Sequence, residues 1–229
     1  VHLILDRAGN NDVVVLGEIL THEAYEGQFF PEFNELHSPA SDVHRFPPED
    51  VWVEAAEMRP GNSKVVHHGE VWVLPPGSKW MSDAVPGVSY PQTERPKIGE
   101  DQIDILGKFN PGLGAQTFEF GDSAKFVPRG SDLVFEIHYT AVGTPQIDRT
   151  KVGLVFAKGP HTTRYFTSYG PTAGNLVIPA GDHNAEVVSE VTATTDMKLV
   201  YAQPHMHLRG KDYELRALFP TGESQTLFK

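Results

Sequence analysis

Short apolar runs, in which hydrophobic and polar residues often alternate, recur along the chain from residue 51 onward. Alternation of this kind is typical of β-strands, whose successive side chains point to opposite faces of a sheet. Turns such as Pro60-Gly61 and Pro128-Arg129-Gly130 separate the runs, and no long stretch follows the helical period. The pattern predicts an all-β sandwich or barrel. The predicted strands are Val51–Met58, Val65–Leu74, Leu133–Tyr139, Lys151–Ala157, Glu186–Ala193, Met197–Gln203 and Tyr213–Phe219.

The same pattern divides the chain into residues 1–48, 49–162 and 163–229. Residues 1–48 carry eight acidic residues, two arginines and four histidines with weak periodicity, which favours an edge extension or the tail of a preceding domain. Residues 49–162 are interpreted as a first β-sandwich domain, and residues 163–229 as the truncated start of a second one. The polar segment from Trp80 to Asp104 is predicted to be an extended surface loop.

Composition excludes several functions. With 30 acidic and 19 basic residues the net charge is −11, and no basic cluster is present, so a nucleic-acid partner is not expected. The absence of cysteine rules out disulfides, thiolate metal sites and a cysteine nucleophile. The longest apolar stretch, Val13–Leu20, is interrupted by Gly17 and Glu18, so no membrane span is expected. Because the chain starts at Val1 instead of Met, we expect a processed product.

Motifs for phosphoryl transfer, serine hydrolysis and hydride transfer are missing from the sequence. The histidines are more informative, because imidazole is the commonest protein ligand for Zn, Cu, Fe and Ni. On the Leu133–Tyr139 strand the apolar side chains are predicted to face the core. Glu136 and His138 then share the other, wetter face, where Glu136 can hydrogen-bond and orient the His138 ring.

A second histidine pair, His205 and His207, lies two residues apart. On a strand both side chains face the same way as Tyr201 and Gln203, whereas Met206 points in the opposite direction. This spacing brings two imidazoles to one ion without distorting the strand.

The adjacent pair His67 and His68 is different, because neighbours on a regular strand face opposite ways. Joint ligation by this pair requires a β-bulge, a strand end or bonding through different ring nitrogens. The remaining histidines are interpreted as ordinary solvated side chains: His2, His22, His37, His44, His161 and His183.

Five stretches follow one another in order: Arg59-Pro-Gly-Asn-Ser-Lys-Val-Val-His67-His68, Pro128-Arg-Gly-Ser-Asp-Leu-Val-Phe-Glu-Ile-His138-Tyr-Thr, Asp148-Arg-Thr-Lys-Val-Gly-Leu, Ile178-Pro-Ala-Gly181 and Pro204-His205-Met-His207-Leu-Arg-Gly210. In these motifs the chain resembles the copper type II, ascorbate-dependent monooxygenases. This family includes peptidylglycine α-hydroxylating monooxygenase and dopamine β-monooxygenase, and the resemblance is greatest to its bacterial branch. It covers the chain from about Val51 to the end.

The resemblance implies two jelly-roll-like β-sandwich domains that face each other across a cleft. It implies that His67, His68 and His138 hold a first copper, and that His205 and His207 hold a second, catalytic copper. The implied activity is hydroxylation of an aliphatic C–H bond of a small organic substrate, with O2 and ascorbate or a similar reductant. The implied location is periplasmic or extracellular.

The chain also departs from this family. The second copper of the family takes a Met ligand well downstream of the His-x-His motif, whereas this chain ends at Lys229, shortly after His207. Residues 163–229 are too few for a complete second sandwich, so we expect a C-terminal continuation or a partner chain to complete it. Gln203 stands where the peptide-amidating branch has Arg, so a peptide carboxylate is not the expected substrate.

Other interpretations use the same histidines. A non-catalytic copper-binding or electron-transfer protein would lack a complete second site. A cupin-type Fe or Mn site needs a Glu soon after His-x-His, whereas Glu214 lies seven residues beyond His207. A zinc hydrolase with a three-histidine site would use Glu136 as its base. The last interpretation is a β-sandwich with purely structural histidines.

Overall fold

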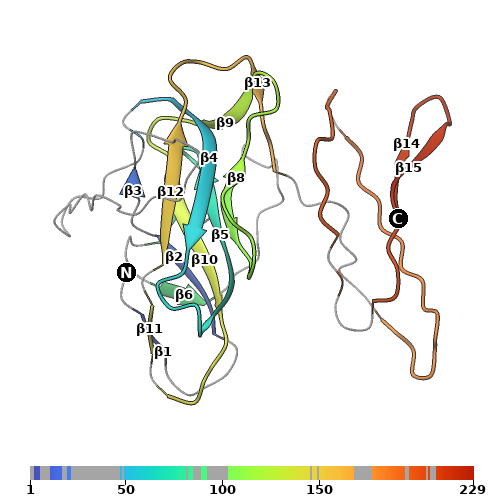
Figure 1. Ribbon diagram of the computed structural model, residues 1–229, viewed down its shortest axis with the longest axis horizontal. Coiled ribbons are helices and arrows are strands. Elements are labelled where there is room, and N and C mark those ends of the chain that lie inside the picture. Colours follow the sequence, from blue (N-terminus) through green and yellow to red (C-terminus); the bar gives the residue numbers. More distant parts are fainter. Residues whose placement is uncertain are drawn as a thin grey trace. The chain divides into compact units, whose positions relative to one another are not determined.

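The computed structural model describes residues 3–5, 11–16, 20–21, 47, 49–80, 82–84, 89–91, 103–144, 146–148, 150–167, 177–193, 196–204, 206 and 210–229. Within these ranges every regular element is a β-strand (Figure 1), so the predicted all-β class is confirmed. The same ranges contain no helix with the length and apolar character needed to cross a membrane.

The chain divides into two units, Val1–Glu190 and Val191–Lys229. The boundaries predicted at residues 48 and 162 differ from this division, and the domain assignment stays a prediction. Part of the N-terminal segment belongs to the first unit, because β2 (Asn11–Leu16) pairs with β10 (Asp132–Tyr139).

Two sheets form the first unit. Sheet I has the strand order β6-β2-β10-β5-β7, and sheet II has the order β13-β9-β4-β12-β3, with β8 also paired to β4. The other strands of sheet I are β5 (Val66–Leu74), β6 (Ser89–Pro91) and β7 (Asp104–Phe109). The strands of sheet II are β3 (Leu20–Thr21), β4 (Val51–Arg59), β8 (Gln116–Thr117), β9 (Ser123–Val127), β12 (Lys151–Phe156) and β13 (Thr163–Arg164). A separate ladder joins β1 (Leu3–Leu5) to β11 (Gln146–Asp148).

The main hydrophobic core lies between sheets I and II. As predicted from the alternation, the apolar set of β10 faces this core: Leu133, Phe135, Ile137 and Tyr139 are all buried. Side chains of β4 and β12, among them Met58 and Leu154, contribute to the same cluster from sheet II. The packing of two sheets through one apolar layer is the arrangement of a β-sandwich.

The opposite face of sheet I is also covered, which the sequence did not predict. Trp72, Ile105 and Val134 are buried there in a second apolar cluster, against which Trp80 packs. The expectation that the Glu136 face of β10 is wet is therefore wrong for Glu136, which is buried as well.

The prediction of an extended surface loop from Trp80 to Asp104 is wrong at both ends of that segment. Trp80 contacts Trp72, with ring centroids 5.4 Å apart. At the other end Ile103 is buried and Asp104 begins β7. In between, β6 pairs with β2. Apolar side chains in an otherwise polar segment supply the cover for sheet I.

The second unit contains the hairpin of β14 (Leu215–Leu218) and β15 (Ser224–Phe228), which confirms the strand predicted within Tyr213–Phe219. Residues 186–193 and 196–203 form no strand in the described part of the chain, so both of those predicted strands are wrong there. Val188 and Met197 are exposed. The apolar alternation is present, but a strand also needs a partner for its backbone hydrogen bonds.

Gly69 of β5 marks a close approach between the two sheets. A Cβ added to Gly69 would lie 2.6 Å from Cε of Met58 in sheet II and 3.2 Å from the carbonyl oxygen of Glu136. At Gly107 of β7, by contrast, the nearest atom to such a Cβ would be Cβ of Ala56, at 3.5 Å. The two glycines therefore form a matched pair that differs in the available space.

A buried ion pair joins the two sheets at one edge of the sandwich. Nζ of Lys125, on β9, lies 2.9 Å from both carboxylate oxygens of Asp104, on β7. The ammonium group also lies 4.9 Å from the ring centroid of Phe118 and 5.2 Å from that of Tyr165. Burial lowers the pKa of Lys125, and the neighbouring Asp104 opposes that shift. The backbone N–H of Thr167 donates to the same carboxylate.

The close approach at Gly69 predicts that Gly69→Ala lowers the free energy of unfolding by about 1 kcal/mol, because the added Cβ displaces the Met58 methyl group and crowds the backbone carbonyl oxygen of Glu136 within a packed core. Gly107→Ala, the matched control, should leave stability unchanged or slightly raised. Urea denaturation followed by tryptophan fluorescence measures both. Equal effects of the two substitutions would contradict the packing argument.

Lys125→Met leaves the Asp104 carboxylate buried without its cation. Because breaking a buried pair on one side is costly, we expect a loss of about 3–5 kcal/mol in the free energy of unfolding. Adding Asp104→Asn to Lys125→Met should recover part of this loss. Thermal and chemical denaturation measure the cycle, and a Lys125→Met loss below about 1 kcal/mol would show that the pair contributes little.

Candidate metal centre

A shift in strand register brings two adjacent histidines to the same face of sheet I. His68 lies opposite His138, whereas Val66 lies opposite Tyr139, and His67 is the extra residue at this irregularity. Such a β-bulge places two residues of one strand against one of its partner and turns the extra side chain. The condition required for joint ligation by adjacent histidines is therefore met.

The three imidazoles of β5 and β10 lie together and are called the histidine cluster: His67, His68 and His138. Nδ1 of His67 is 2.9 Å from Nδ1 of His68, so one ring donates a hydrogen bond and the other accepts it. The His68 ring stacks on the His138 ring, with centroids 3.9 Å apart and planes at 19°. His67 is exposed at the surface and the other two rings are partly buried.

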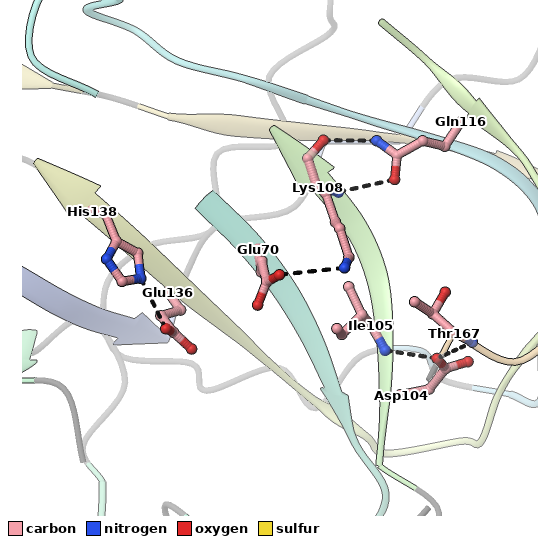
Figure 2. Close-up of polar contacts among 8 residues, drawn as sticks. All are labelled: Glu70, Asp104, Ile105, Lys108, Gln116, Glu136, His138 and Thr167. Atoms are coloured by element: carbon pink, nitrogen blue, oxygen red, sulfur yellow. Dashed lines mark hydrogen bonds and ion pairs between the residues drawn. The ribbon is translucent and has the colours of Figure 1, made fainter. Parts of the chain in front are cut away.

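Glu136 contacts the ring of His138, the third histidine of the cluster (Figure 2). Its Oε1 lies 3.0 Å from Nε2 of His138, two residues further along β10. Only 1% of the Glu136 side chain is exposed, against 14% for His138. The predicted contact between the two side chains is present, although in a buried setting. When His138 keeps this contact, the ring nitrogen that remains to bind a metal is Nδ1.

A row of charged side chains continues from Glu136 across the sheet. Glu70 of β5 is the register partner of Glu136, and Lys108 of β7 is the register partner of Glu70. Nζ of Lys108 lies 3.4 Å from Oε1 of Glu70. Gln116 fixes the Lys108 backbone, since its amide donates to the Lys108 carbonyl oxygen and accepts from the Lys108 N–H. Charge in this row is thus partly compensated within the sheet.

Tyr139 follows His138 but points into the main core. Its hydroxyl donates to Oδ2 of Asp148 at 2.9 Å. Burial and the Asp148 carboxylate both raise the pKa of Tyr139, so the phenol stays protonated and remains a hydrogen-bond donor at neutral pH. The sequence contained no signal for this contact.

The chemistry of the donor set fits a late first-row metal, because imidazole nitrogen is a preferred ligand of copper and zinc. The rings do not yet converge: the His68 and His138 planes are nearly parallel, so their in-plane lone pairs do not meet at one point. In the described ranges no group of three His, Asp or Glu side chains has metal-holding geometry as it stands. The χ2 torsion of histidine is broad, so rotation about χ2 changes the direction of a ring nitrogen without moving a strand.

The residues predicted to surround the second metal are placed only in part. His205 and His207 lie outside the described residues. Tyr201 and Gln203 lie in an irregular segment and are exposed, so the shared strand face expected for them is absent. The second metal site stays a prediction.

His161 was interpreted as an ordinary solvated histidine, and that interpretation is wrong. Its side chain is only 12% exposed, and its two ring nitrogens each lie 3.3 Å from a carboxylate oxygen, of Glu54 and of Asp122. Hydrogen bonds from Thr162 are the main cause of a lowered pKa of Asp122. Glu54 is 107 residues away along the chain, so no local sequence pattern could reveal this contact.

Glu214, the carboxylate considered for a cupin-type site, is engaged within the hairpin of the second unit. Nε of Arg216 lies 2.5 Å from its Oε1, and Lys229 lies 3.6 Å from its Oε2. The hydrogen bond from Arg216 is the largest cause of a pKa of Glu214 lowered to about 2. This ionised, paired side chain gives the cupin interpretation no support.

Comparisons with protein-family models, with curated proteins and with solved structures found no match to this chain. The candidate centre is therefore characterised by its own geometry. Its distinguishing feature is the bulge that places His67 beside His68, within reach of His138 across the strand pair.

Proposed function

We propose that the first unit is a copper-binding domain in which the histidine cluster holds one ion. The observation that carries this proposal is the shift in register, which gathers three imidazoles on one face of two paired strands. A cluster of neutral nitrogen donors suits copper better than it suits Mg²⁺ or Ca²⁺, which prefer oxygen. Glu136 orients His138 through Nε2, as carboxylates beside metal-binding histidines commonly do.

We further propose that the complete protein is a copper-dependent monooxygenase that hydroxylates an aliphatic C–H bond of a small organic substrate. This rests on the order of the histidine motifs and on their resemblance to the copper type II, ascorbate-dependent family. When bound, copper supplies the one-electron oxygen chemistry that side chains lack. His205 and His207 would bind the second ion, with O2 and an ascorbate-type reductant as co-substrates. Two jelly-roll-like domains and an exported location belong to the same proposal.

A copper-binding or electron-transfer protein without oxygen chemistry is the second candidate. It is favoured by the position of the histidine cluster, all of which lies on β5 and β10 within the first unit. A zinc hydrolase receives less support, because Glu136 is buried and engaged with His138 instead of open to a water molecule.

Tight copper binding is predicted to depend on His68 and His138, the stacked pair of the cluster. The His205→Ala/His207→Ala background removes the histidines of the proposed second site, so that only the first site remains. In this background we expect His68→Ala or His138→Ala to abolish tight Cu(II) binding measured by competition titration. Glu136→Ala should weaken it by about 10–100-fold, the usual range for a group that orients a metal ligand, and Glu136→Gln by less. His183→Ala, at an exposed histidine, is the control. Affinities equal to this control in His68→Ala and His138→Ala would contradict the proposal.

Oxygen consumption distinguishes the two candidate functions. The complete, copper-loaded protein with ascorbate and a panel of small aliphatic substrates should consume O2 faster when a substrate is present than without it, if it is a monooxygenase. His205→Ala/His207→Ala should stop that consumption while copper remains bound at the histidine cluster. Copper binding without substrate-dependent consumption would instead favour the electron-transfer candidate.

A further inference from the structure

Asp148, at the end of β11, is the centre of a buried hydrogen-bond network beside the bulge. Only 2% of the residue is exposed. Its Oδ1 accepts from the backbone N–H of Asn62 at 2.7 Å, and its Oδ2 accepts from the hydroxyls of Tyr139 at 2.9 Å and Thr150 at 2.6 Å. A buried carboxylate that accepts several hydrogen bonds is held firmly, because leaving such a group unsatisfied is costly. Asp148 therefore fixes the positions of its donors.

Asn62 connects this network to the start of β5. Its carbonyl oxygen accepts from the backbone N–H groups of both Val65 and Val66, each at 3.2 Å. Its side-chain amide donates to Oε1 of Gln146 and to the carbonyl oxygen of Ile147 on β11. The turn that leads into β5 is thus attached to β11 through the backbone and the side chain of one residue. His67 follows Val66 directly.

Tyr139 connects the same carboxylate to β10 on the other side of the bulge. It is the register partner of Val66 and immediately follows His138. Beyond this pair the N–H of Thr140 donates to the carbonyl oxygen of Val65 at 2.7 Å. Asp148 therefore holds both strands at the first pair that follows the irregularity.

The position of that pair decides where the His67 side chain points. Without the extra residue, Tyr139 would pair with His67, and alternation would turn His67 to the face opposite His68. Holding Val66 against Tyr139 forces the extra residue to be His67. We propose that Asp148 is a positioning residue for the histidine cluster, because its carboxylate fixes the register shift that places His67 beside His68.

Two hydroxyl deletions at the same acceptor atom test this proposal. Tyr139→Phe removes the donor attached to the bulge, whereas Thr150→Val removes a donor that has no part in it, and both hydroxyls bind Oδ2 of Asp148. A purely stabilising role for Asp148 predicts similar effects of both substitutions. The positioning role predicts that Tyr139→Phe and Asp148→Asn alter the cluster, while Thr150→Val does not.

The first measurement needs no metal. Interstrand nuclear Overhauser effects in the metal-free chain should report the Val66–Tyr139 and His68–His138 pairs in the wild type and in Thr150→Val. In Asp148→Asn and Tyr139→Phe we expect a second set of interstrand nuclear Overhauser effects, in which residue 139 is paired with His67. Should Asp148→Asn fail to fold, Tyr139→Phe carries the test. Wild-type pairing in Tyr139→Phe and in every folded Asp148→Asn sample would overturn the proposal.

The second measurement rests on the proposed copper site. In the His205→Ala/His207→Ala background, Tyr139→Phe should lower the Cu(II) affinity about tenfold, or 1.4 kcal/mol. The same substitution should change the nitrogen hyperfine pattern in EPR. Thr150→Val should keep a Cu(II) affinity within twofold of that of its parent. Identical affinity and spectra for the two variants would contradict positioning. If the cluster binds no copper at all, the copper proposal fails, while the interstrand contacts still decide the role of Asp148.

Discussion

The position of one extra residue in a strand pair determines everything that the candidate centre can do. On a regular ladder His67 and His68 would face opposite sides of sheet I, one toward solvent and one toward the main core. The shift between the His68–His138 and Val66–Tyr139 pairs places both rings on the same face. Any chemistry of the histidine cluster depends on this shift.

The face that carries the cluster is unusually protected for the outside of a two-sheet sandwich. Trp72, Trp80 and Val134 form an apolar cover beside the charged row. Glu136 is buried on the same face, with its Oε1 in contact with Nε2 of His138. A carboxylate in a poorly solvated position interacts strongly with its neighbours, so this arrangement favours one orientation of the His138 ring. The surrounding sheet thus contributes rigidity and electrostatics as well as position.

The features that could be predicted from the sequence depend on neighbouring residues within one strand. The features that could not be predicted depend on contacts between residues far apart along the chain. The inward face of β10 was predicted correctly because alternation needs no information beyond the strand itself. The bulge in β5 depends on Asn62 and Asp148, which are 86 residues apart along the chain. Glu136 was expected to be wet because alternation within β10 does not show that the second face of sheet I is also covered, in part by Trp72 and Ile105 of neighbouring strands. Residues 186–203 alternate as strands do, yet alternation states a preference for one face and does not supply a partner strand.

Copper K-edge X-ray absorption of the full chain carrying His205→Ala/His207→Ala, loaded with one equivalent of Cu(II), tests the central claim most directly. The claim that the bulge gathers three imidazoles at one ion predicts multiple scattering from three histidine rings, falling to two when His67 alone is replaced by Ala. A spectrum with one imidazole or none, or one that His67→Ala leaves unchanged, would contradict it.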